Sequence, residues 1–273
     1  MAKTDNLSDF LTDVANSIRT KTGTTEQINA QDFSDKILSI SGLKELIAGK
    51  TSCSKLFITY NGTSVDNLIQ YSDTENITGM SEMFRDCTNL TTIPLLNTSN
   101  VLDMDEMFSG CRALTTIPLL DTSKVTSMMY MFKSCDALTT IPLLNTSSVT
   151  YMNYMFASCD SLTTIPLLDT SNVHTMNSMF EFCGNLTTVP ALDVSNVTNM
   201  GGMFAYCPRL KSILMTNIGA DLDISGSTQF EREDLLVILN NLRAVTSATT
   251  LTMGATNLAK LTEEDKAIAT NKG

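Results

Sequence analysis

The residues of this chain best suited to chemistry are cysteines that recur at a spacing of 24. Thiolates bind zinc and attack electrophiles, so a regular series of cysteines suggests a metal site first. Metal sites need two to four ligands that converge at short spacing, and this chain has no C-x-x-C pair and a single histidine. The spacing therefore predicts a file of buried, reduced and metal-free thiols, one per repeat: Cys87, Cys111, Cys135, Cys159, Cys183 and Cys207.

The chain offers no set of catalytic residues. His174 is the only histidine and takes a repeat position that Thr126, Thr150 and Thr198 fill elsewhere. No phosphate-binding loop, nucleophile elbow or acidic pair stands in a known motif. We therefore expect neither an enzyme nor a cofactor.

Tyrosines are the better candidates for binding a ligand. Tyr151 and Tyr154 are three residues apart, Tyr130 takes the place of Tyr154 one repeat earlier, and His174 takes the place of Thr150 one repeat later. Exposed tyrosines are rigid and amphipathic and are enriched where proteins bind partners or sugars. The sequence predicts one ligand-binding patch from these four residues, with the alternative that each ring lies over neighbouring Met and Thr side chains.

Repeats must position these side chains. Met-Phe pairs recur at the same spacing of 24, and each repeat carries a phrase such as Leu114-x-x-Ile117-x-Leu119. A fixed period of about 20 to 29 residues with this leucine spacing is typical of a leucine-rich-repeat solenoid. We expect a right-handed α/β solenoid with one parallel sheet, in which each core residue packs on its own copies: Leu90, Leu114, Leu138, Leu162 and Leu186 for the leucines.

Within one coil we expect a short strand, a turn and a short helix. Leu114 to Ile117 alternates like a half-buried strand, and Pro118 limits its length. Asp121, or Asn145 in the next coil, folds back onto backbone N–H groups. The apolar spacing of 125–132 predicts about two turns of helix with its methionines in the core, although a methionine ladder also suits an adaptable binding surface.

The sequence divides into three parts. For residues 1–45 the sequence predicts two small helices, with three alternative roles: docking, oligomerisation or covering the first coil. For residues 46–218 it predicts the solenoid. Residues 219–273 leave the period and predict strand, helix, strand and helix, as a cap on the last coil. Two capping boxes support these helices, Thr228 with Glu231 and Thr262 with Asp265.

The amino-acid composition argues against some classes of binding partner. The chain has 273 residues, of which 42% are hydrophobic, but no apolar run long enough to span a membrane. A net charge of −11 argues against nucleic acid. The opening MAKTDNLSDF has neither a basic nor an apolar segment of a signal peptide, so we expect synthesis in a cytoplasm without export by that route.

Two resemblances add to this interpretation. Coils such as LTTIPLLDTSNVHTMNSMFEFCGN resemble the BspA-like leucine-rich repeats of bacterial surface proteins, and TLTMGATNLAKLTEEDKAIATNKG resembles the segment that often follows them. Similar tails continue into an aromatic-rich finish, whereas this chain stops at Gly273, as a shortened cap or an incomplete gene product would. The opening LTDVANSIRTKTGTTEQINAQDFSDKILSI resembles a segment near the start of many phage tail and other virion structural proteins.

Together the resemblances imply a non-enzymatic virion structural protein, assembled in the host cytoplasm. It would be a tail-associated receptor-binding protein, a fibre or a head decoration. Residues 1–45 would contact other virion proteins or form a homo-oligomer, and the solenoid would contact a host surface protein or glycan, without nucleic acid or membrane insertion. The alternative is a bacterial cell-surface or secreted adhesin or interaction protein with leucine-rich repeats.

Overall fold

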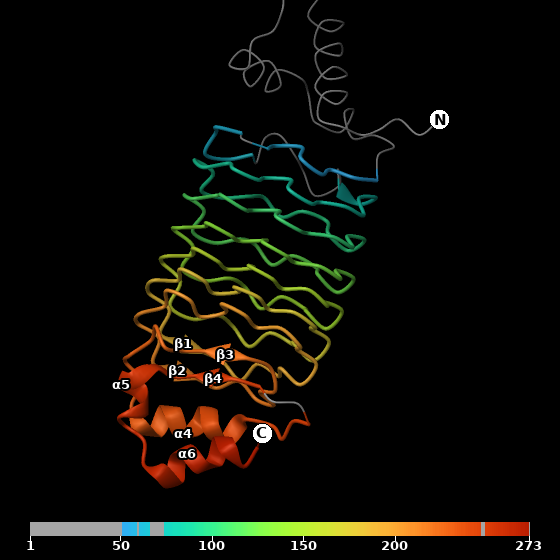
Figure 1. Ribbon diagram of the computed structural model, residues 1–273. Coiled ribbons are helices and arrows are strands. Elements are labelled where there is room, and N and C mark those ends of the chain that lie inside the picture. Colours follow the sequence, from blue (N-terminus) through green and yellow to red (C-terminus); the bar gives the residue numbers. More distant parts are fainter. Residues whose placement is uncertain (1–50, 59, 66–73, 247–248, 273) are drawn as a thin grey trace, which may run out of the picture.

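A computed structural model describes residues 51–58, 60–65, 74–246 and 249–272, which form a column of stacked coils closed at one end by helices (Figure 1). The helices predicted within residues 1–45 lie outside the described residues. The boundaries predicted at residues 45 and 218 stay predictions.

Backbone hydrogen bonds join each coil to the next through the segment that contains the Met-Phe pair. In one coil, the N–H groups of Met128, Tyr130 and Phe132 donate to carbonyls of the following coil, at 3.1, 2.9 and 2.9 Å. Parallel bridges run through the same segment in every coil, in the file Ser52, Gly79, Asp103, Ser127, Tyr151, Thr175 and Asn199. This side of the column therefore holds the coils in register.

The helix predicted over 125–132 is wrong, because this segment is a pair of consecutive turns. The N–H of Met131 donates to the Met128 carbonyl and that of Cys135 to the Phe132 carbonyl. The third residue of each turn, Tyr130 and Ser134, has a positive φ of 58° and 56°. A left-handed residue cannot continue a right-handed helix, and a positive φ at the third residue is typical of type II turns.

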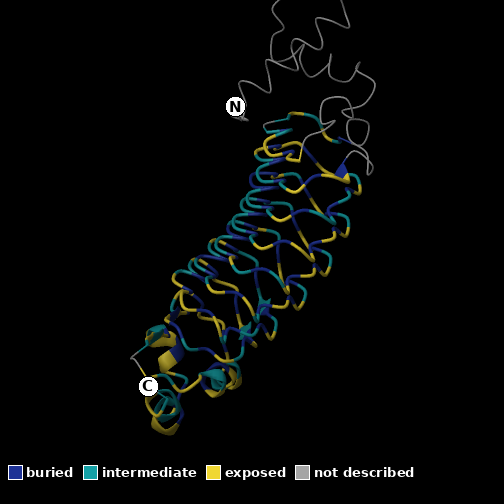
Figure 2. Cartoon of the chain, turned by 90° about the vertical axis from the view of Figure 1, so that its right-hand side faces the viewer, coloured by how far each residue is buried: buried dark blue, intermediate teal, exposed yellow. Residues whose placement is uncertain are grey.

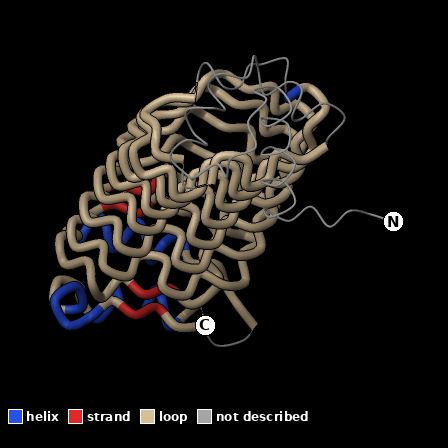
Figure 3. The backbone as a smooth tube through the Cα atoms, turned by 90° about the horizontal axis from the view of Figure 1, so that it is seen from above, coloured by secondary structure: helices blue, strands red, loops and turns tan. Residues whose placement is uncertain are grey.

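The strand predicted at Leu114–Ile117 is also wrong in most coils. Among the copies that the structure describes, only the last two form strands, β1 (Thr188–Val189) and β2 (Ser212–Ile213), which pair in parallel. A second parallel pair, β3 (Leu222–Asp223) with β4 (Leu251–Thr252), stands apart, so there is no single sheet among the described residues. In Figure 3 the coils are mainly loop when seen along the column. A recurring proline, which has no N–H to donate, explains why strands on this side are short or missing.

The core consists of files of identical side chains, as the repeat predicts. Parallel phenylalanine rings stack along the column at centroid distances of 5.2 to 5.8 Å, from Phe57 through Phe84, Phe108, Phe132, Phe156 and Phe180 to Phe204. The predicted leucine file and the Met-Phe methionines are buried. Figure 2 shows the same burial pattern repeated from coil to coil.

The C-terminal elements follow the predicted order, with one short helix added. They are β3, α4 (Arg232–Asn241), β4, α5 (Gly254–Leu258) and α6 (Glu263–Thr270). The capping box of Thr262 with Asp265 is confirmed, whereas that of Thr228 with Glu231 is wrong, because Glu231 is itself the N-cap and pairs with Asp234. Lys272 donates to the carbonyls of Leu239 and Asn240 at the end of α4, which ties the last residues to the cap.

Candidate functional site

The cysteine file is structural in its contacts. Each thiol lies in the core and donates to the carbonyl of a phenylalanine in the preceding coil; Cys135 Sγ, for example, lies 3.2 Å from Phe108 O. The other thiols of the file make the same contact at 2.9 to 3.1 Å. Burial raises the pKa of the Cys207 thiol to about 11 and that of Cys135 well above its ordinary value. A thiol that stays protonated is a poor nucleophile and a poor ligand.

Burial of the thiols has a consequence for stability at alkaline pH. Below pH about 8.5 the Cys207 thiol is protonated in both the folded and the unfolded chain, so its contribution is fully present. As the pH rises from there towards about 11, the unfolded chain loses the proton first and the free energy of unfolding falls. Urea denaturation from pH about 8 to about 10.5 should show this fall, and Cys207→Ala should make it shallower. Equal slopes for the two chains would contradict the assignment.

The structure brings together two of the four residues predicted to bind a ligand. The rings of Tyr130 and Tyr154 stack at 4.7 Å with an angle of 6°, and Lys133 Nζ lies 5.3 and 5.7 Å from their centroids. Tyr151 is 45% exposed and belongs to the bridge file. His174 is exposed, and its backbone N–H donates to Thr150. Tyr130 and Tyr154 therefore lie side by side on turns of neighbouring coils, and the ligand-binding patch stays a prediction.

A row of exposed leucines is the feature that the sequence analysis missed. Leu119 is the last leucine of the repeated phrase and is 61% exposed, whereas its neighbour Leu120 is buried. The same holds in the neighbouring coils, and we define the leucine row as Leu95, Leu119, Leu143 and Leu167, which are 52 to 62% exposed. A shallow groove runs along it, and is lined also by Asp121 and Asn145.

Turn chemistry explains why the leucine row points outward. Asp121 accepts hydrogen bonds from the N–H and hydroxyl of Ser123, at 3.0 and 2.7 Å, as the sequence predicts. Thr122 is buried and donates to the carbonyl of Asn145 in the next coil, at 2.7 Å. These contacts fix the corner that follows Leu120, and only one of two consecutive leucines can then enter the core.

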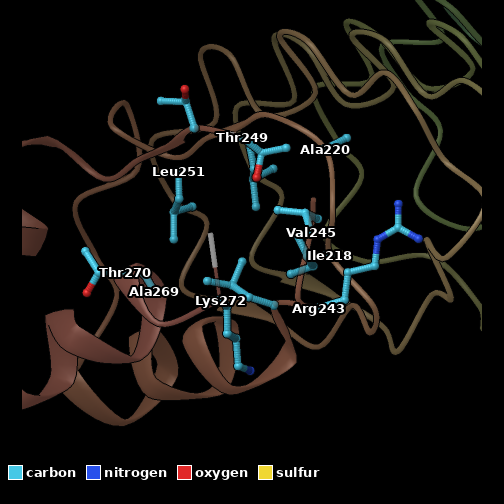
Figure 4. Close-up of a pocket in the computed structure, with 12 residues that line it drawn as sticks. Ile218, Ala220, Arg243, Val245, Thr249, Leu251, Ala269, Thr270 and Lys272 are labelled. Atoms are coloured by element: carbon cyan, nitrogen blue, oxygen red, sulfur yellow. The ribbon is translucent and has the colours of Figure 1, made fainter. Parts of the chain in front are cut away.

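A cavity at the C-terminal end is lined by aliphatic side chains between β4, α6 and the segment after α4 (Figure 4). The two cations at its rim are engaged elsewhere, because Arg243 donates to the Ser195 carbonyl and Lys272 to the end of α4. Within the described residues no group of three His, Cys, Asp or Glu could hold a metal ion. No described helix has the length and apolar character to cross a membrane.

Two overlapping stretches of the repeats, residues 51–161 and 115–218, match the family described as "Mycoplasma protein of unknown function, DUF285". The chain belongs to this family. No curated protein matches this DUF285 chain in sequence. Neither family match includes residues 1–45, which carry the resemblance to virion proteins.

Two solved structures are similar to this DUF285 chain, and one of them bears on its fold. The leucine-rich repeat protein of T. pallidum (TpLRR) matches with a TM-score of 0.51 and 20% identity, over 71% of this chain and 84% of that one. A leucine-rich repeat protein from Bacteroides ovatus matches at a TM-score of 0.38 and 20% identity, over 72% and 57%. The first likeness shows a leucine-rich-repeat-like structure and nothing about activity.

Proposed function

We propose that this chain is a non-enzymatic bacterial interaction protein, at the cell surface or secreted, that binds a protein partner through the leucine row. Its fold is proposed to be a right-handed solenoid that serves as a rigid support for this row. The family match and the fold likeness both point to bacterial proteins, which supports this alternative over the virion interpretation.

One observation carries the proposal: the position of the leucine row is exposed and yet stays leucine in four consecutive coils, before Ala191 takes it in the next. The phrase LTTIPLL occurs unchanged at 90–96, 114–120, 138–144 and 162–168. At another surface position of the coil, Thr126 becomes His174 two coils later and is Leu102 one coil earlier, and all three side chains are exposed. Core packing does not require these exposed leucines, so their repetition over four coils supports a constraint on the leucine row of another kind.

The chemistry of the leucine row fits a protein partner. Several large apolar side chains in line, with no charge inside the phrase that carries them, form the kind of exposed apolar surface that marks protein interfaces. Asp121 and Asn145 at the groove edge supply a polar rim. A nucleic acid would find no basic counterpart on this surface.

The virion interpretation remains the second candidate, supported by the resemblance of residues 1–45. It proposes that this segment contacts other virion proteins and that the solenoid contacts a host protein or glycan.

One experiment separates the two candidates. Intact bacteria that make the chain are treated with an external protease, their medium is assayed, and virions induced from the same culture are purified. We expect the chain at the cell surface or in the medium and at background level in virions. The chain without residues 1–45 is the control. If the full chain co-purifies with virions and the shortened chain does not, the result supports the virion candidate instead.

A further inference from the structure

A second aromatic pair, Phe182 with Tyr206, lies on the surface near the capped end of the column. Their rings stack at a centroid distance of 4.4 Å with an angle of 5°. Phe182 is 46% and Tyr206 66% exposed. Both residues have positive φ, 59° and 58°, at successive copies of one turn position, so the pair belongs to the surface turns and not to the core.

One face of the Tyr206 ring is open. Phe182 covers the other face, and Tyr206 is 66% exposed. In the coil that follows, Gly226 lies beside the Tyr206 backbone, where a Cβ would be 4.0 Å from Tyr206 N, and as a glycine it brings no side chain towards the ring. Tyr206, Gly226, Gly184 and Pro208 line a surface pocket. The pocket can therefore take a flat group against the ring.

Two carboxylates line the same pocket. Asp223 accepts the N–H of Ser225 through Oδ1, at 2.8 Å. Asp160 lies opposite Gly184 in the next coil, where a Cβ would be 3.6 Å from Asp160 Oδ1. Neither carboxylate forms an ion pair with another residue in the described part of the chain. The pocket thus combines an open aromatic face with uncompensated negative charge.

The tyrosine pair described above shows what such an arrangement attracts. Lys133 lies over the stacked rings of Tyr130 and Tyr154 and supplies a cation from the same coil. Among the described residues no lysine or arginine is found over Phe182 and Tyr206. The second pair has the aromatic faces and the negative charge that favour a cation, but none of its own.

We propose that this pocket binds the guanidinium group of an arginine on a partner protein. A guanidinium is planar, stacks on aromatic rings and pairs with carboxylates through several N–H donors at once. An ammonium is a compact point charge without a flat face to stack. Tyr206 supplies the stacking face, and Asp160 and Asp223 supply the charge. This inference is independent of the leucine row, because it uses a different turn and different chemistry.

The test is a titration of the full chain, carrying ring-labelled tyrosine, followed by nuclear magnetic resonance. The probes are N-acetyl-arginine amide and its neutral counterpart N-acetyl-citrulline amide, and Tyr206→Phe assigns the Tyr206 signal by its loss. We expect the arginine probe to shift the Tyr206 signal in a saturable way and the citrulline probe to leave it unchanged. The double variant Asp160→Asn with Asp223→Asn should bind about tenfold more weakly.

Gly226→Leu supplies an independent check, because its side chain occupies the pocket while its backbone has no positive φ to strain. It should abolish the shift with an unchanged melting temperature. Three results would overturn the proposal: equal shifts with citrulline, no change in the double asparagine variant, or no saturable shift at all. Tighter binding of methyl glucoside than of the arginine probe would assign the pocket to a sugar instead.

Discussion

Replacing Leu119 and Leu143 together by aspartate should weaken binding of the protein partner at least tenfold without unfolding the chain. The two side chains are 61% and 62% exposed, so little core packing is lost. Covering the exposed part of one leucine contributes about 1 to 2 kcal/mol, and an aspartate in its place must be desolvated as well. Loss of two leucines at the centre of the row should thus exceed the about 1.4 kcal/mol that corresponds to tenfold.

The measurement compares immobilised chains. Proteins from fractionated bacteria are retained on the natural chain, on the leucine variant and on a control with Thr126→Asp and Thr150→Asp, and are quantified by mass spectrometry. The control adds the same charge in the same two coils, at positions that do not line the groove of the leucine row. Partners that the natural chain and the control retain, and that the leucine variant loses, support the account; equal retention by all three would exclude the leucine row.

Phe132→Ala should lower the free energy of unfolding by about 3 to 5 kcal/mol. The Phe132 ring is fully buried and stacks between Phe108 and Phe156, at 5.6 Å on both sides. Because each coil contacts only its neighbours, the cavity interrupts packing between two halves of the column, and the unfolding transition should broaden or split. Urea denaturation followed by circular dichroism measures both effects.

Phe132→Leu is the matched variant for this position. It keeps most of the apolar volume and loses the ring stacking, so its cost should be clearly smaller than that of alanine. A loss of less than about 1 kcal/mol for alanine would show that the phenylalanine file does not hold the coils together.

The sequence predicted the core well because core positions repeat. Leucine, methionine and cysteine at a period of 24 could only form files, and the structure buries them as files. It also predicted the turn at Asp121 and the order of the C-terminal elements, where local chemistry decides the conformation.

Local patterns misled where two conformations share one spacing. Met128 and Met131 are three apart in a helix and also in the turn that joins them, and only the left-handed φ of Tyr130 separates the two. Glu, Tyr and Ser residues hide that φ in five of the six coils: Glu82, Glu106, Tyr130, Tyr154 and Ser178. Gly202 and Gly110, at the same positions in other coils and with positive φ, were the available signal.

The candidate surface was harder to predict than the core. Two consecutive leucines, Leu119 and Leu120, gave no sign of which one faces inward, since this depends on the corner that follows. Likewise Phe182 and Tyr206 lie one period apart, but their stacking depends on turns that the helical interpretation excluded.

Site-specific photo-crosslinking shows directly whether the leucine row contacts a protein partner. A benzophenone side chain is placed at Leu119, at Leu143 or at Thr126, and bacteria that make each chain are irradiated. The account predicts a covalent adduct with the same protein from Leu119 and Leu143 and none from Thr126. An adduct from Thr126 alone, or no adduct from any of the three positions, would contradict the assignment of the leucine row as the binding surface.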